Sequence, residues 1–169
     1  MKKFFLFLAF SLFLSTFNSC KLNDGYSDYT PKIVLFNPAQ LNSDSALYFK
    51  STTNVRVGKI DSLHVGDTLR LKIGMDAYLN TLIQFDYSIN DTAAFKAIIP
   101  DSIKSVFESM DYSKGKFLFD PRYSVVILPI DFIALKQSDS ISCAFKVYSN
   151  AVKVSNEDAI GFVTKIKPQ

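Results

Sequence analysis

Catalytic side-chain types are sparse in this chain. His64 is the only histidine, and a lone histidine beside a Gly-Asp turn is typical of a solvated surface position. The sequence has no His-Glu-x-x-His pair, no Cys-x-x-Cys pair and no Gly-x-Ser-x-Gly elbow, so the local signatures of zinc sites and hydrolase nucleophiles are missing. Glu108 and Glu157 are the only glutamates, and neither lies in the apolar setting that suits a general acid. We therefore expect no catalytic residue, no metal site and no cofactor.

The two cysteines stand in different surroundings. Cys20 follows a leader in which two lysines precede the apolar run FFLFLAFSLFL, residues 4–14. This run is too short for a membrane span of about 20 residues and is typical of a secretory signal. Cys143 lies in ISCAFKV, where apolar and other residues alternate, so we expect it to point inward as a small hydrophobe.

The segment Phe17-Asn18-Ser19-Cys20 resembles the lipobox of bacterial lipoproteins of the Bacteroidetes type. The small residue before the cysteine fits the family pattern, whereas Phe17 stands where the family favours leucine. The resemblance implies cleavage before Cys20, acylation of that cysteine, and an outer-membrane lipoprotein that faces the periplasm or the cell surface. Several acyl chains on one residue give stable membrane attachment, which a single chain does not. An acylated Cys20 also leaves Cys143 without a disulfide partner.

The alternative is ordinary cleavage that leaves Cys20 as a free thiol. An unpaired reactive group on the N-terminal segment of an exported protein is an unfavourable arrangement, so lipidation is the favoured hypothesis. The chain then divides into a signal peptide (1–19), a lipidated N-terminus with a flexible tether (20–31) and a single domain (32–169). The tether is indicated by KLNDGYSDYTP, which is polar and has no apolar period.

Six tripeptides share one form: Asp, then Ser or Thr, then an aliphatic residue. This form occurs more often than the composition predicts, and it resembles the acceptor motif of the general O-glycosylation system of exported Bacteroidetes proteins. The candidate acceptors are Ser45, Ser62, Thr68, Thr92, Ser102 and Ser140. The alternative is structural, because Asp-Ser and Asp-Thr pairs also make turns and helix N-caps. Ser62, Thr92 and Ser140 lie in predicted turns and are the best placed acceptors.

From residue 32 onward the sequence predicts mainly strands, and these strands must position the candidate residues. Alternating apolar and polar residues predict strands within 32–36, 45–49, 55–74, 81–89, 116–119, 123–135, 140–149 and 160–166. Ile103, Val106, Phe107 and Met110 instead fall on one face of a helix, with Asp101 or Ser102 as its N-cap, and residues 92–99 could add a helical turn.

This pattern predicts a mainly β fold, an antiparallel immunoglobulin-like β-sandwich with a short helical insertion around 92–110. VGDTLRLKIGMDA followed by LIQFDYSI resembles the second and third strands of bacterial immunoglobulin-like domains on surface lipoproteins. The resemblance covers about a fifth of the chain and implies an architecture, not a ligand.

Charge excludes a nucleic-acid partner. The whole chain has 19 basic and 16 acidic residues, and two of the lysines belong to the leader. The remaining basic residues are scattered, whereas a nucleic-acid surface needs a basic stripe.

We therefore expect a membrane-anchored, non-catalytic binding or interaction module of the cell envelope, with a glycan or an envelope protein as ligand. Exposed tyrosines gathered in one cluster of loops would favour this hypothesis, and the candidates are Tyr26, Tyr29, Tyr78, Tyr112 and Tyr123. The alternative is a structural or accessory subunit of a surface complex, which a broad apolar patch or an open edge strand would favour. A hydrolytic enzyme, which would need a deep pocket of converging carboxylates, is the least favoured hypothesis.

Overall fold

The computed structural model describes residues 29–169. The predicted signal peptide, Cys20 and Tyr26 lie outside the described residues. No helix within 29–169 is long and apolar enough to cross a membrane.

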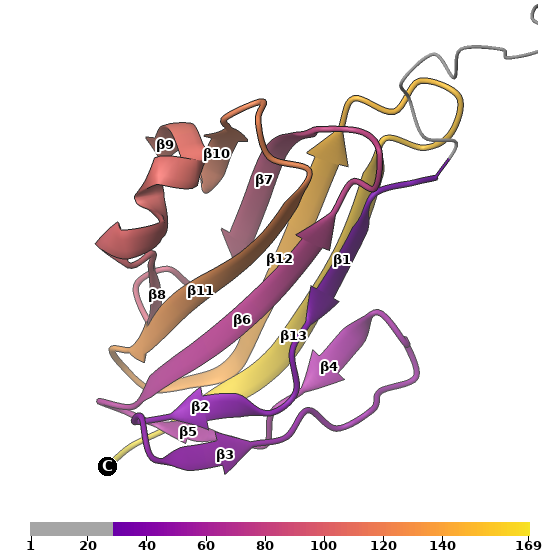
Figure 1. Cartoon of the computed structure of the whole chain (residues 1–169). Coiled ribbons are helices and arrows are strands. Elements are labelled where there is room, and N and C mark those ends of the chain that lie inside the picture. The colour runs from indigo at the N-terminus through magenta and orange to yellow at the C-terminus, as the bar shows by residue number, and fades with distance from the viewer. Residues whose placement is uncertain (1–28) are drawn as a thin grey trace, which may run out of the picture.

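Two sheets pack face to face (Figure 1). The six-stranded sheet contains β1 (Lys32–Leu35), β2 (Ala39–Leu41), β3 (Ser45–Leu47), β6 (Thr68–Asp76), β8 (Phe95–Ile98) and β11 (Val125–Ala134). The seven-stranded sheet contains β4 (Val57–Lys59), β5 (Leu63–His64), β7 (Leu82–Ile89), β9 (Phe107–Asp111), β10 (Lys116–Phe119), β12 (Ser138–Ser149) and β13 (Glu157–Lys167). The predicted immunoglobulin-like β-sandwich is confirmed as the fold class. It is antiparallel except that β4 and β5 pair with β13 in parallel.

The core lies between the sheets and follows the predicted alternation. Leu69, Leu71 and Ile73 of β6 are buried, and so is Cys143 within β12. Fully buried phenylalanine rings fill the centre, with neighbouring ring centroids 5.2–6.4 Å apart. These residues are Phe85, Phe95, Phe117, Phe132, Phe145 and Phe162. Buried rings of this size dominate the apolar area that stabilises a small core.

The predicted helical insertion is only partly correct. Residues 95–98 form strand β8, so the helical turn expected within 92–99 is wrong. A short 3₁₀ helix, η2 (Asp101–Val106), follows, and Phe107 already begins β9. Pairing of β8 with β11 and of β9 with β10 overrides the helical spacing of the apolar residues.

The expected N-cap is also wrong. Pro100 occupies the cap position of η2, and no side chain caps the helix. The Asp101 carboxylate instead pairs with Lys104, at 2.5 Å.

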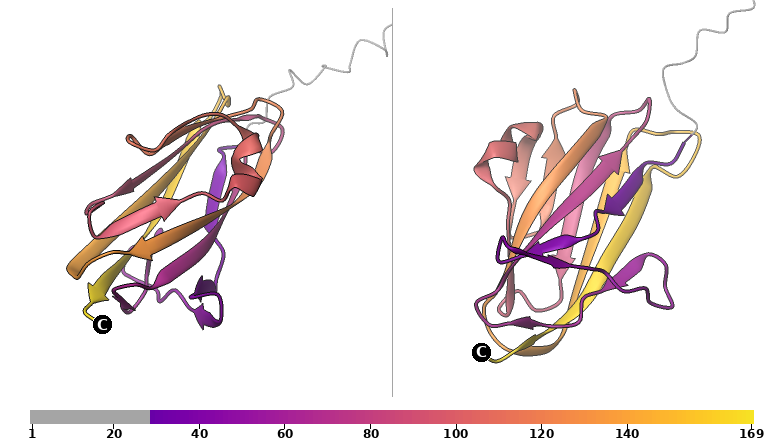
Figure 2. Two further views of the ribbon diagram at one scale, coloured as in Figure 1. Left: turned by 90° about the vertical axis from the view of Figure 1, so that its left-hand side faces the viewer. Right: turned by 60° about the horizontal axis from the view of Figure 1, so that its bottom comes forward.

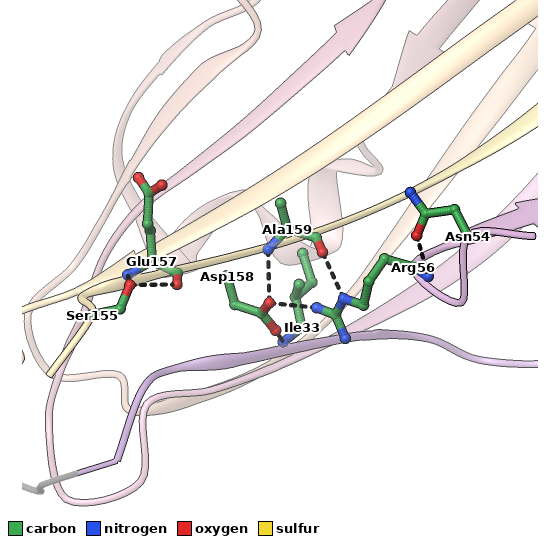
Figure 3. Close-up of polar contacts among 7 residues, drawn as sticks. All are labelled: Ile33, Asn54, Arg56, Ser155, Glu157, Asp158 and Ala159. Carbon is green, nitrogen blue, oxygen red and sulfur yellow. Dashed lines mark hydrogen bonds and ion pairs between the residues drawn. The ribbon is translucent and has the colours of Figure 1, made fainter.

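Hydrogen bonds and an ion pair around Asp158, here called the Asp158 staple, join β1 to β13 at one side of the sandwich (Figure 3). Asp158 of β13 accepts a hydrogen bond from the Ile33 amide of β1 at 3.0 Å and pairs with the Arg56 guanidinium at 2.5 Å. Arg56 also donates to the Ala159 carbonyl at 2.9 Å. Both sheets are therefore tied together through one half-buried carboxylate.

The two ends of the sandwich differ in what they carry. Residue 29 and the β12–β13 hairpin lie at one end, here called the tether end, and the C-terminus lies at the opposite, far end (Figures 1 and 2). At the tether end, Thr81 and Asn150 join two loops, 77–81 and 149–156. The Thr81 amide donates to Asn150 Oδ1 at 2.8 Å, and the Asn150 amide donates to the Thr81 carbonyl at 3.2 Å.

Candidate functional site

A cleft of about 590 Å³ opens along one long side of the sandwich. Its lining comes from β8 and η2 and from the end of β7 and the β9–β10 turn. Figure 1 shows where these elements lie. Its volume falls in the range of small-molecule sites. We call it the side cleft.

Apolar residues line the inner part of the side cleft. Phe95, Ala97 and Ile99 are buried, and all three border the cleft together with half-buried Ile89. The strand alternation of β8 explains this, because Phe95 and Ala97 share the inward face while Lys96 and Ile98 are exposed.

Tyr87 and Tyr112 also border the side cleft, and both rings pack against Phe117. The Tyr87 ring stacks on Phe117 with centroids 5.6 Å apart, and the Tyr112 ring meets Phe117 edge-on at 5.2 Å. Desolvation by burial raises the pKa of Tyr87, and the nearby Tyr112 raises it further. The Tyr87 phenol therefore stays protonated near neutral pH and can donate a hydrogen bond.

The β9–β10 turn is held against β7 by a glycine. The Tyr87 amide donates to the Gly115 carbonyl at 2.8 Å, and Gly115 has a φ of +62°. A Cβ at Gly115 would lie 2.1 Å from the Tyr87 carbonyl oxygen, so only glycine allows this approach. The Asp111 side chain accepts from the Ser113 amide at 3.0 Å and orders the same turn.

Charge at the rim of the side cleft is mostly positive. Lys96, Lys104 and Lys114 border the cleft, and Asp101 is the one carboxylate among its lining residues. The hydrogen bond between Lys104 and Asp101 raises the pKa of Lys104 and lowers the pKa of Asp101, so both groups are charged at neutral pH. Glycoside hydrolysis uses a pair of carboxylates, and the lining of this cleft offers a single carboxylate that is already paired.

The structure brings two candidate acceptors together and leaves the others apart. Ser62 and Ser140 both line a depression of about 420 Å³ on the outer face of the seven-stranded sheet, beside Lys59, Lys165 and Lys167. Thr92 borders the side cleft. Ser45, Ser102 and Thr68 stand separately, the first two exposed and the last half-buried. Ser140, expected in a turn, lies within β12 where its register with β13 shifts.

Structural roles account for some of the aspartates before these acceptors. Asp67 accepts from the His64 amide at 2.7 Å, and Asp91 accepts from the Ala94 amide at 3.0 Å, so both order turns. Asp44 and Asp139 make no side-chain hydrogen bond or ion pair within the described part of the chain. For residues 29–169, none of the six acceptor hydroxyls is engaged in a hydrogen bond. All six are thus chemically available at or near the surface.

Other residues singled out by the sequence are placed outside the cleft. The His64 side chain is exposed and lies 3.9 Å from Asp67. Cys143 faces the core, where burial raises the pKa of its thiol and keeps it unreactive. Among residues 29–169, no three His, Cys, Asp or Glu side chains are grouped so that they could hold a metal ion.

The candidate tyrosines within 29–169 do not gather in one cluster of loops, the arrangement that would have favoured the binding hypothesis. Tyr29 and Tyr78 meet at the tether end with ring centroids 5.3 Å apart, whereas Tyr112 borders the side cleft. Tyr123 is half-buried. Sequence reasoning also missed Tyr87, because Tyr112 is 25 positions away and β10, which pairs with both β7 and β9, brings the two segments together.

A second surface is an apolar patch on the outer face of the six-stranded sheet, here called the sheet patch. Val34 and Ile127 flank Gly74 in one cross-strand row, and Val125 and Phe36 extend the patch along the strands. These four apolar side chains are exposed. A Cβ at Gly74 would lie 2.8 Å from the Phe36 ring, so the glycine leaves room for that ring over the sheet.

Comparisons with known proteins give only distant likenesses. No family model and no curated protein matches the chain. One similar solved structure is a family 123 glycoside hydrolase from Clostridium perfringens, with 12% identity over 83% of this chain and 28% of that chain, and a TM-score of 0.44. Another is the CaDoc0917–CaCohA2 complex, with 17% identity over 64% of this chain and 94% of that chain, and a TM-score of 0.36. Neither likeness is strong enough to carry an argument about function.

Proposed function

We propose that this chain is an exported lipoprotein, anchored in the outer membrane through Cys20, whose sandwich is a non-catalytic binding module of the cell envelope. The side cleft is the observation that carries the binding role. It combines an apolar floor with two phenols and three lysines, which is the composition of a ligand site: apolar lining with a few polar groups that fix orientation.

The chemistry of the side cleft favours a glycan ligand. Tyr112 is exposed at the rim, so a sugar ring can stack on it. The protonated Tyr87 phenol and the lysine ammonium groups are donors for sugar hydroxyls or carboxylates. The single, ion-paired carboxylate in the lining supports binding over hydrolysis.

A second candidate function is that of an accessory subunit in a surface complex. The sheet patch favours it, because exposed apolar side chains that adjoin on a flat sheet are a common feature of protein interfaces. In that case the partner is an envelope protein and the contact is made by the outer face of β1, β6 and β11.

O-glycosylation of the chain itself accompanies this proposal. Ser45 and Ser140 are the strongest candidates, since both are exposed and the side chains of their preceding aspartates make no hydrogen bond or ion pair within 29–169. Ser62, Thr68, Thr92 and Ser102 are the remaining acceptors.

Site-specific photo-crosslinking separates the two candidate functions. A photoreactive phenylalanine placed at position 112 reports the side cleft, one at 127 reports the sheet patch, and one at Lys136 in the exposed 135–137 loop is the control. With the full chain in its native host, we expect carbohydrate-containing adducts at position 112. Adducts at 127 alone would replace the cleft proposal with the accessory-subunit function, and adducts at neither position would overturn both.

A further inference from the structure

Four apolar or aromatic side chains protrude at the tether end, here called the apolar tip. Leu79 is 70% exposed, Val152 is 72% exposed, Tyr29 is 68% exposed and Tyr78 is 39% exposed. They come from loops 77–81 and 149–156 and from the start of the described chain. Exposed side chains of this kind gathered at one end of a domain usually mark a contact surface.

The loops hold these side chains outward in an ordered arrangement. The Tyr78 amide donates to the Asp76 carboxylate at 2.6 Å, and the Asn80 amide donates to the Ala77 carbonyl at 3.0 Å. Asn80 is itself buried beneath the loop. Tyr78 has a φ of 58°, in the left-handed region that non-glycine residues rarely adopt. A strained residue that projects an aromatic ring into solvent points to a function at that position.

The closeness of the apolar tip to Cys20 along the chain indicates which partner it contacts. Tyr29, which contacts the Tyr78 ring, is preceded by the segment that links the domain to Cys20. The eight residues 21–28 span at most about 30 Å even when fully extended. An acyl anchor on Cys20 therefore keeps the tip within that distance of the lipid headgroups.

We infer that the apolar tip seats in the interfacial layer of the same membrane that holds the anchor, so that the domain stands end-on with its far end directed away. This inference rests on the proposed anchoring at Cys20. Tyrosine suits the headgroup region because its ring is apolar and its hydroxyl is polar, and Leu79 and Val152 supply the side chains that enter the acyl boundary.

A short tether makes even a weak contact effective. Linking a surface to its partner raises the effective concentration to the millimolar range, so the tip needs little intrinsic affinity for lipid.

Fluorescence of labelled cysteines tests this inference independently of native lipidation. The chain from residue 20, with Cys20→Ser and an N-terminal polyhistidine segment, is tethered to phosphatidylethanolamine–phosphatidylglycerol vesicles that contain a nickel-chelating lipid. An environment-sensitive label is placed by Leu79→Cys, Val152→Cys, Ile127→Cys or Lys136→Cys, since the native Cys143 is buried.

We expect emission at positions 79 and 152 to rise and shift to shorter wavelength on tethering, with no change at 136. Adding Leu79→Asp to the Val152→Cys chain should remove most of the response at 152. Unchanged emission at 79 and 152, or a response at 127 alone, would overturn the inference. A failure of Cys20 to be acylated in the native host would leave these results unchanged, so the two proposals fail separately.

Discussion

Phe117 orients the two tyrosines of the side cleft, although it is not itself among the residues that line the cleft. Its buried ring supports Tyr87 on one side and Tyr112 on another, so both phenols are oriented by the core. Aromatic pairs of this kind contribute about 0.5–1.5 kcal/mol beyond the area that they bury. A binding site whose polar groups are fixed by core packing loses little side-chain entropy on binding.

The six acceptor hydroxyls give a prediction at the scale of single residues. Intact mass of the protein from its native host should exceed that of unmodified protein by lipid plus glycan increments. Ser140→Ala should remove one increment, because Ser140 is exposed and the Asp139 side chain makes no hydrogen bond or ion pair within 29–169. Ser88→Ala, an exposed serine that follows Tyr87 instead of an aspartate, is the control and should remove none. A native mass explained by lipid alone would refute glycosylation.

At the scale of elements, β1 depends on the Asp158 staple. β1 belongs to the six-stranded sheet, yet its Ile33 amide is bonded to a carboxylate of β13 in the other sheet. The Asp158 side chain is only 24% exposed, so removing its charge leaves donors of Arg56 and Ile33 poorly satisfied. Such losses are costly, because a half-buried donor without its partner keeps its desolvation penalty.

Asp158→Asn should therefore lower the free energy of unfolding by about 1–3 kcal/mol. Urea unfolding measures it, as a lower midpoint with an unchanged slope. Asp61→Asn is the matched control, since the Lys50–Asp61 pair has the same 2.5 Å distance but an Asp61 side chain that is 61% exposed. The control should leave the urea midpoint nearly unchanged, because an exposed ion pair contributes little to stability. Equal effects of the two substitutions would mean that the staple adds nothing to stability.

Local alternation was enough to predict most strands and the inward direction of Cys143. It failed at 92–110, where the same residues fit two periods: Phe95 and Ala97 also alternate with Lys96 and Ile98, and pairing with β11 selected the strand. The side cleft was beyond local patterns altogether. Tyr87 and Tyr112 line one cleft because β10 pairs with both β7 and β9. Ser62 and Ser140 line one depression because β5, which follows Ser62, and β12 both pair with β13.

At the scale of the whole molecule, two of the three surfaces adjoin, because Val125 of the sheet patch pairs with Asp76, the residue that precedes the 77–81 loop of the apolar tip. The apolar tip lies at the tether end, the sheet patch lies beside it on β1, β6 and β11, and the side cleft is lined by β8 and the β9–β10 turn. Figure 1 shows where these elements lie. A domain that stands end-on at a membrane leaves the side cleft open to a ligand, whereas the sheet patch lies close to the lipid surface. Anchoring through one end is therefore compatible with ligand binding in the side cleft.

The central claim, anchoring through Cys20, is tested most directly by fractionating cells that express the full chain or its Cys20→Ser variant. The account predicts that the unaltered protein sediments with the outer membrane and that Cys20→Ser protein appears in the soluble fraction. The released protein should keep the same urea unfolding midpoint, because the sandwich begins beyond the cysteine. The apolar tip alone should not retain it, since such contacts are weak without a tether. Cys20→Ser protein that stays in the membrane fraction would contradict the account.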